Sequence, residues 1–81
     1  MLTPVQTAHV SRVFPESKAL MASYLTAGAD VVIFRQTECG SDVPPIAIAV
    51  ASDHSFWIDC CETEDAAQAR AKELGLRTVP L

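Results

Sequence analysis

Two short runs in the middle of the chain alternate in a way that predicts a β-hairpin. Residues 46–51 read Ile-Ala-Ile-Ala-Val-Ala, so large and small apolar side chains alternate with the two-residue period of a strand. Residues 56–61 (Phe-Trp-Ile-Asp-Cys-Cys) are rich in residue types that favour strands. Between the runs, residues 52–55 have the composition of a turn. The pattern therefore predicts two antiparallel strands joined by a turn centred on Asp53 and His54.

A helix follows this hairpin and has the clearest local signals of the chain. Thr63 can cap its N-terminus, and the two acids after it fall in the first turn, where the helix dipole favours negative charge. Residues 66–74 are strong helix formers. Gly75 followed by Leu76 is typical of a Schellman ending, with the glycine in the left-handed conformation. The apolar side of this helix is mostly alanine, so we expect it to lie close against the surface it covers.

The expected turn also fixes which residues of the two strands lie opposite each other. One face would carry the alanines and the other the larger residues of the first strand. Both faces are then largely apolar, whereas a sheet with one wet face alternates apolar and polar residues. We expect the alanine-rich helix to cover the alanine face. The expected pairs are Ala51–Phe56, Ala49–Ile58 and Ala47–Cys60 on the alanine face, and Val50–Trp57, Ile48–Asp59 and Ile46–Cys61 on the other.

Three upstream segments are assigned from their composition and boundaries. Residues 31–35 are a run of β-branched and aromatic residues that predicts a third strand. Residues 36–45 are mostly polar and are interrupted by a glycine and two prolines, which indicates a loop. Pro15 at a helix start and Gly28 as its stop enclose a broad apolar stretch, which predicts a helix over residues 16–25.

The first 14 residues allow two interpretations. Thr3, Pro4 and Gln6 supply the cap, the first-turn proline and the glutamine of a capping box, which favours a short helix ended by Pro15. Residues 7–14 partly alternate, so a strand is the alternative. The helix gives the order ααβββα, and the strand gives βαββα, closer to a ferredoxin-like split βαβ arrangement. Either way we expect one small α+β domain over residues 1–81, with helices on a mainly antiparallel three-stranded sheet.

Charge and composition make some classes of protein unexpected. Ten acidic and six basic residues give a net charge of −4, and the basic residues are scattered, so direct binding to nucleic acid is not expected. No stretch is apolar over the roughly 20 residues that a membrane span needs, and the N-terminus lacks the features of a signal peptide. Three cysteines, an odd number, favour free thiols in a reducing compartment, which indicates a cytoplasmic protein.

Residues with catalytic or metal-binding chemistry follow no known pattern in this chain. The sequence contains no GxSxG, P-loop or GxGxxG motif and no CxxC, HxH or HExxH spacing. Cys60 and Cys61 would point to opposite faces of a strand, and Cys39 lies in a loop whose acids would blunt its reactivity. We expect no enzyme, cofactor or metal. The alternatives are a thiol- or metal-dependent protein using Cys39, Cys60, Cys61 and His54, or a small enzyme with its site at an oligomer interface.

Trp57 is the strongest candidate for a binding residue. In the expected register it lies among the large residues on the face without a helix. Asp59 on that face indicates that the face lies near the rim of the protein and not deep in the core, because a buried unpaired carboxylate is costly. The alternative is that Trp57 closes a thin hydrophobic core. Tryptophan beside aliphatic residues is typical of a binding hot spot, so we expect a protein that acts by contact with a partner protein or with itself. The candidate partner-binding residues are Trp57, Ile46, Ile48, Val50 and Asp59.

An acidic inhibitor is a more specific version of this function. Glu62, Glu64 and Asp65 form an acidic patch that is suited to a basic partner, with an ordinary solvated helix start as the alternative. In its size, acidic charge and lack of motifs the chain resembles the anti-CRISPR proteins of phages and mobile elements. The resemblance implies an inhibitor or decoy of a larger, nucleic-acid-binding machine. Binding to such a partner would weaken with added salt.

Overall fold

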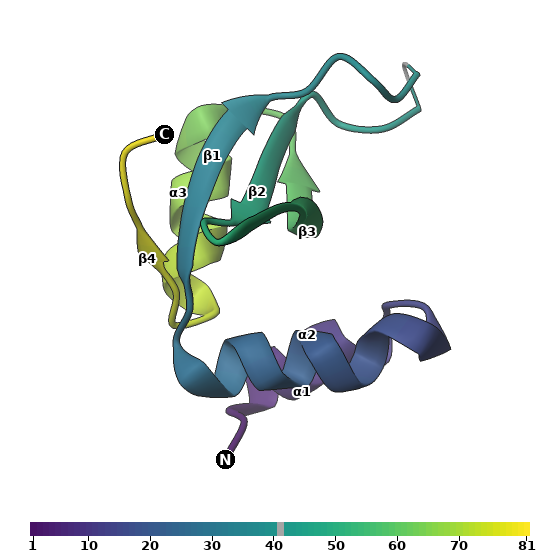
Figure 1. The fold of residues 1–81 in the computed structure, drawn as a ribbon, viewed down its shortest axis with the longest axis vertical. Coiled ribbons are helices and arrows are strands. Elements are labelled where there is room, and N and C mark those ends of the chain that lie inside the picture. The colour runs from purple at the N-terminus through teal and green to yellow at the C-terminus, as the bar shows by residue number, and fades with distance from the viewer. Residues whose placement is uncertain (41) are drawn as a thin grey trace.

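The computed structural model describes residues 1–40 and 42–81, which form three helices and a four-stranded mixed sheet (Figure 1). Ser41, in the loop predicted over residues 36–45, lies outside the described residues. The sheet order is β3-β2-β1-β4, with β4 parallel to β1 and the other neighbours antiparallel. The elements are α1 (Pro4–Ser11), α2 (Pro15–Ala27), β1 (Asp30–Arg35), β2 (Ile46–Val50), β3 (Asp53–Cys61), α3 (Glu64–Glu73) and β4 (Arg77–Thr78).

The N-terminal segment is a helix, so the order ααβββα is confirmed for the first six elements and the alternative βαββα is wrong. The capping box forms as expected: the Thr3 hydroxyl accepts from the Gln6 amide at 3.2 Å, and the Gln6 side-chain oxygen accepts from the Thr3 amide at 2.8 Å. The Lys18 ammonium donates to the carbonyls of Val10 and Ser11, at 3.2 and 3.0 Å. These bonds add side-chain donors to carbonyls in the last turn of α1, and they fix the turn into α2.

Glycine ends both longer helices in the left-handed conformation, with φ of 64° at Gly28 and 72° at Gly75. After α3, the Gly75 amide donates to the Lys72 carbonyl at 3.0 Å and the Leu76 amide to the Ala71 carbonyl at 2.9 Å. These are the two hydrogen bonds of a Schellman motif, so the predicted ending of α3 is confirmed.

The fourth strand is the first difference from the expected three-stranded sheet. Arg77 and Thr78 pair in parallel with Asp30 and Val31, and the Val79 amide continues the contact with a 2.8 Å bond to the Val31 carbonyl. The Arg77 guanidinium adds two 2.9 Å hydrogen bonds to the Asp30 carboxylate. A two-residue strand has no hydrophobic periodicity, so it depends on a partner 47 residues away in the sequence.

The hairpin has the expected register over only half its length. Three pairs match the expectation, but Ala49 lies opposite Trp57 and Val50 opposite Asp53, with irregularities on either side of Ala49. The expected pairs Ala49–Ile58, Val50–Trp57 and Ala51–Phe56 are therefore wrong. The physical reason is the turn: β3 already begins at Asp53, so the chain reverses earlier than expected and the extra residues of β3 form a β-bulge. The three confirmed pairs are Ile46–Cys61, Ala47–Cys60 and Ile48–Asp59.

The helices cover the face of the sheet that carries the large residues of β2. Ile46, Ile48 and Val50 belong to the core cluster together with the apolar side of α3, so the helix does not cover the alanine face as expected. The alanines of α3 and the large side chains of β2 belong to this one cluster, and small residues opposite large ones allow the helix to lie close to the sheet. Figure 1 shows α3 along this face and α1 and α2 together at the end of the sheet away from the 36–45 loop. The core consists of Met21, Leu25, Val31, Ile46, Ile48, Val50, Ile58, Ala67, Ala71, Leu74 and Leu76.

Candidate binding face

The second face of the sheet carries a row of apolar residues that cross the three long strands. Strand pairing joins its members directly: Val32 lies opposite Ala49, Phe34 opposite Ala47, and the two alanines in turn lie opposite Trp57 and Cys60. Among the described residues, no helix lies over this face (Figure 1). We call it the aromatic face and define it as Val32, Phe34, Ala47, Ala49, Trp57 and Cys60.

Two aromatic rings cover the centre of the aromatic face. The rings of Phe34 and Trp57 meet edge to face, with centroids 6.1 Å apart and planes at 79°. Ala47 and Ala49 on the central strand are 0 % exposed, while both rings are half-buried. Because alanine side chains are short, rings from the flanking strands can meet above them, and such a pair is favourable beyond the area it buries. The Trp57 indole N–H donates to the His54 carbonyl at 3.1 Å, which holds the ring in place.

The loop after β1 turns this face into one wall of a groove. The groove has a volume of about 460 Å³, with Phe34 and Trp57 on its apolar side. Gln36 is buried and anchors the loop: its side-chain oxygen accepts from the Cys39 amide at 2.9 Å, and its side-chain amide donates to the Pro44 carbonyl at 3.3 Å. The groove is lined by Phe34, Arg35, Gln36, Thr37, Glu38, His54, Trp57 and Leu81.

The structure separates the residues that the sequence places together as a partner-binding set. Only Trp57 lies on the aromatic face. Ile46, Ile48 and Val50 are 0–2 % exposed in the helix-covered core, so their placement on an exposed face is wrong. Asp59 also turns away from the aromatic face and accepts from the Arg70 guanidinium of α3 at 2.9 Å. The bulge in β3 separates Trp57 from the other four residues, because it moves Trp57 to the side of the alanines.

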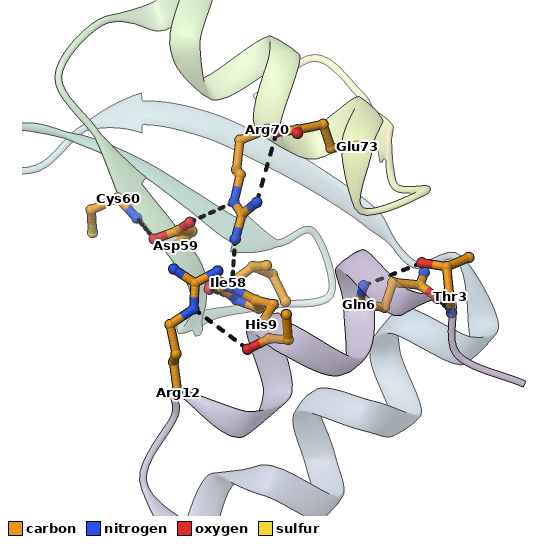
Figure 2. Close-up of polar contacts among 10 residues, drawn as sticks. Thr3, Gln6, His9, Arg12, Ile58, Asp59, Cys60, Arg70 and Glu73 are labelled. Carbon is orange, nitrogen blue, oxygen red and sulfur yellow. Dashed lines mark hydrogen bonds and ion pairs between the residues drawn. The ribbon is translucent and has the colours of Figure 1, made fainter.

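A polar network on the helix side ties α1, β3 and α3 together (Figure 2). The His9 ring is 5 % exposed, and its Nε2 lies 2.7 Å from the Ile58 carbonyl. Because a carbonyl only accepts, Nε2 carries the proton of the neutral ring, and Nδ1 accepts from the Arg70 guanidinium at 3.0 Å. Arg70 thus donates both to His9 and to the Asp59 carboxylate, and every member of the network has a partner.

The same network occupies one edge of the sheet. β3 is an edge strand, and such strands offer free backbone groups to an added strand. Here the Ile58 carbonyl accepts from His9, and the Cys60 amide donates to the Asp59 carboxylate at 2.8 Å (Figure 2). A further strand along this part of β3 would have to displace both side chains. This part of the β3 edge is therefore a weaker candidate for contact with a partner than the aromatic face.

Gln6 is a second buried polar residue whose tertiary role the sequence did not reveal. Besides its part in the capping box, its side-chain amide donates to the Leu25 carbonyl at 3.2 Å and to the Leu74 carbonyl at 2.7 Å. These carbonyls lie at the ends of α2 and α3, where helices leave acceptors unpaired. The capping motif is the only local signal, because the two acceptors lie 19 and 68 residues away.

The three cysteines differ in their exposure to solvent. Cys39 is exposed, Cys60 and Cys61 are half-buried, and all three are free. Burial, and then the negative charge of Asp59, raises the pKa of both Cys60 and Cys61, so these thiols stay protonated at neutral pH and are poor nucleophiles. Across residues 1–40 and 42–81, no three His, Cys, Asp or Glu side chains gather as ligands for a metal ion.

The acidic residues that follow β3 lie on the surface of the protein. The predicted acidic patch, Glu62, Glu64 and Asp65, is exposed where β3 leads into α3. No described helix is both long and apolar enough to cross a membrane. Comparisons with protein-family models, with curated proteins and with solved structures found no match.

Proposed function

We propose that this protein is a protein-binding module and that the aromatic face is its contact surface. One observation carries the proposal: the half-buried rings of Phe34 and Trp57 stand together on the face that no described helix covers. Tryptophan is enriched in binding hot spots because it buries a large area at a small entropic cost. A partner that covers these rings would remove apolar surface from water at the centre of its interface.

The core supports this assignment, because it is complete without Trp57. Met21, Leu25 and the apolar side of α3 pack on β1 and β2 from the other side of the sheet. Trp57 belongs neither to this cluster nor to the partly buried residues that pack against it. Its ring is therefore free to exchange contact with Phe34 and solvent for contact with a partner without loss of the core. Inhibition of a nucleic-acid-binding machine stays a prediction from composition.

A pull-down with two matched variants tests the proposal. Tagged wild-type protein, Trp57→Ala and Leu20→Ala are incubated with lysate of the source cell, and the retained proteins are quantified by mass spectrometry. Leu20 is a suitable control because its side chain is apolar and 47 % exposed but lies on α2. We expect a protein retained by the wild type and by Leu20→Ala to be lost from Trp57→Ala. Equal retention by all three variants, each with a folded circular dichroism spectrum, would overturn the proposal.

A further inference from the structure

A second hollow lies where the connection between α1 and α2 passes residues 55–58 of β3. Its volume is about 370 Å³. Met21 of α2 and Ile58 of β3 belong to the core cluster and are buried, so the hollow reaches down to the core. A mainly apolar lining with few polar groups is typical of a site that accepts an apolar group. We call it the α2 hollow; its apolar lining consists of Val13, Phe14, Met21, Phe56, Trp57 and Ile58.

Phe14 leaves a large apolar surface in water at the rim of the α2 hollow. Its side chain is 75 % exposed, and among the described residues no other phenylalanine, tyrosine or tryptophan is exposed. A side chain that enters the hollow would cover part of Phe14 and remove that surface from water. Trp57 lines both the α2 hollow and the groove on the aromatic face, so one segment can contact both.

Arg12 is the only charged residue that lines the α2 hollow within the described part of the chain. It is exposed, and Figure 2 shows its side chain reaching from the end of α1 toward Ile58. Its Nε donates to the Ala8 carbonyl at 3.4 Å, and across residues 1–40 and 42–81 its guanidinium forms no ion pair. An apolar hollow with an unpaired guanidinium at its rim is complementary to an apolar side chain beside a carboxylate.

The acids of this chain stay outside the lining of the α2 hollow. Asp53 accepts from the amide and the hydroxyl of Ser55 at 3.2 and 2.6 Å, but Asp53 itself does not line the hollow. Glu16 adjoins the lining residue Ser17 in the sequence and also does not line it. Half of the ten acids belong to the 36–45 loop and to the segment that joins β3 to the first turn of α3. A carboxylate in the hollow therefore meets Arg12 first, on the side away from Asp53.

Resting on the proposed function, we infer that the α2 hollow binds a segment of a partner protein in which an apolar side chain is next to aspartate or glutamate. The apolar side chain enters the hollow beside Phe14 and Trp57, and the carboxylate accepts from the Arg12 guanidinium. His9 already holds the Ile58 carbonyl, so the segment contributes side chains and does not add a strand along β3. A lysine or arginine in the same place would meet a guanidinium of like charge.

Selection from a displayed library of random peptides tests the inference. Wild-type protein is the target, and peptides that also bind Trp57→Ala are removed, so that only ligands dependent on the proposed contact surface remain. We expect these peptides to be enriched in an apolar residue next to aspartate or glutamate. Trp57-dependent peptides that are neutral or basic would overturn the inference and leave the proposed function standing. A selection without any Trp57-dependent peptide would also overturn it, and the pull-down then decides the proposed function separately.

The rim of the α2 hollow is tested next with the best acidic peptide. Trp57 is the only tryptophan of the chain, so its fluorescence reports binding. We expect Phe14→Ala to weaken binding about tenfold and Arg12→Gln about two- to fivefold, as for an exposed charge pair. Lys72→Gln is the matched control, because Lys72 is likewise an exposed base at the end of a helix, α3, but does not line the hollow. Equal affinity of all four proteins, each with a folded circular dichroism spectrum, would overturn the inference.

Sedimentation velocity of the protein alone tests a second copy of this chain as the occupant. We expect wild type and Phe14→Ala to sediment as monomers at micromolar concentration. A wild-type dimer that Phe14→Ala dissociates would place a second copy in the α2 hollow and overturn the inference.

Discussion

The two faces of the sheet are both dry along the central strand β2, but for different reasons. Ile46, Ile48 and Val50 point to one face and Ala47 and Ala49 to the other, and all five are 0–2 % exposed. On the first face, separate elements pack above the strand, with residues of α2 and α3 in the same core cluster. On the second, the rings of Phe34 and Trp57, from the strands on either side of β2, meet edge to face, and no described helix lies above them. A low exposed fraction by itself therefore does not identify a core.

The faces also differ in how polar contacts hold them. On the helix side, His9, Arg70 and Asp59 join α1, α3 and β3, and Gln6 joins the ends of α2 and α3. On the aromatic face, the Trp57 indole makes one hydrogen bond, to a carbonyl of its own strand. Contacts between elements stabilise the fold, whereas a contact within one strand only orients a side chain. The first face thus maintains the fold, and the second is the one that we propose as a binding surface.

The largest loss of stability is expected when a buried side chain on the helix-covered face is truncated. Ile48→Ala removes a side chain that is 0 % exposed and leaves a cavity beneath α3. We expect a loss of about 2–5 kcal/mol in the free energy of unfolding, measured by urea denaturation followed by circular dichroism. For a domain of this size that loss is close to the whole stability. Leu20→Ala, at an exposed position of α2, should change the free energy of unfolding by about 0.5 kcal/mol or less. Similar losses for both variants would contradict the comparison.

The second effect concerns the polar contacts of the helix side. Gln6→Ala leaves the Leu25 and Leu74 carbonyls without their side-chain donor and removes half of the capping box. We expect a loss of about 1–3 kcal/mol in the free energy of unfolding, because buried groups lose their hydrogen bonds. Gln68→Ala, on the exposed side of α3, is the matched control and should be nearly neutral. If the two glutamine variants unfold at the same urea concentration, the hydrogen bonds of the Gln6 side chain contribute nothing to the stability of the fold.

The aromatic face should tolerate truncation better. Trp57→Ala removes a half-buried ring outside the core cluster, and we expect a loss of about 1–2 kcal/mol, below the cost of a fully buried aromatic residue. Circular dichroism is the readout, because the variant lacks the only tryptophan. A loss as large as that of Ile48→Ala would show that the ring is part of the core and would remove the distinction between the faces.

The smallest effect is expected at the exposed ion pair beside β4. The Arg77 guanidinium, through its hydrogen bonds, lowers the pKa of Asp30 in the folded protein. The pair therefore stabilises the fold at neutral pH, and this contribution is lost as the pH falls below about 4, where the carboxylate takes up a proton. Asp30→Asn should have a slightly lower midpoint temperature of thermal unfolding than the wild type at pH 7. At low pH, where Asp30 of the wild type is protonated, the two proteins should have the same midpoint temperature. A constant difference at all pH values would contradict this assignment.

Local signals in the sequence predicted most of the elements. Thr3 and Gln6 predicted the start of α1, and Gly75 with Leu76 the ending of α3, because these motifs close their hydrogen bonds within a few residues. Alternation predicted β2 and its pairing with the second half of β3. The candidate site was found only in part: Trp57 was recognised, but its neighbours were assigned to the wrong face.

The tertiary structure decided the rest, because the interactions involved join residues far apart in the sequence. The bulge in β3 shifts Trp57 from the isoleucine face to the alanine face, and a shift of one position exchanges the two faces of a strand. Phe34 joins the site through strand pairing, and β4 forms only beside β1. The sequence by itself determined the local elements and the net charge. Only the fold placed Phe34 and Trp57 together on a face that no described helix covers, since packing energy depends on which distant surfaces meet.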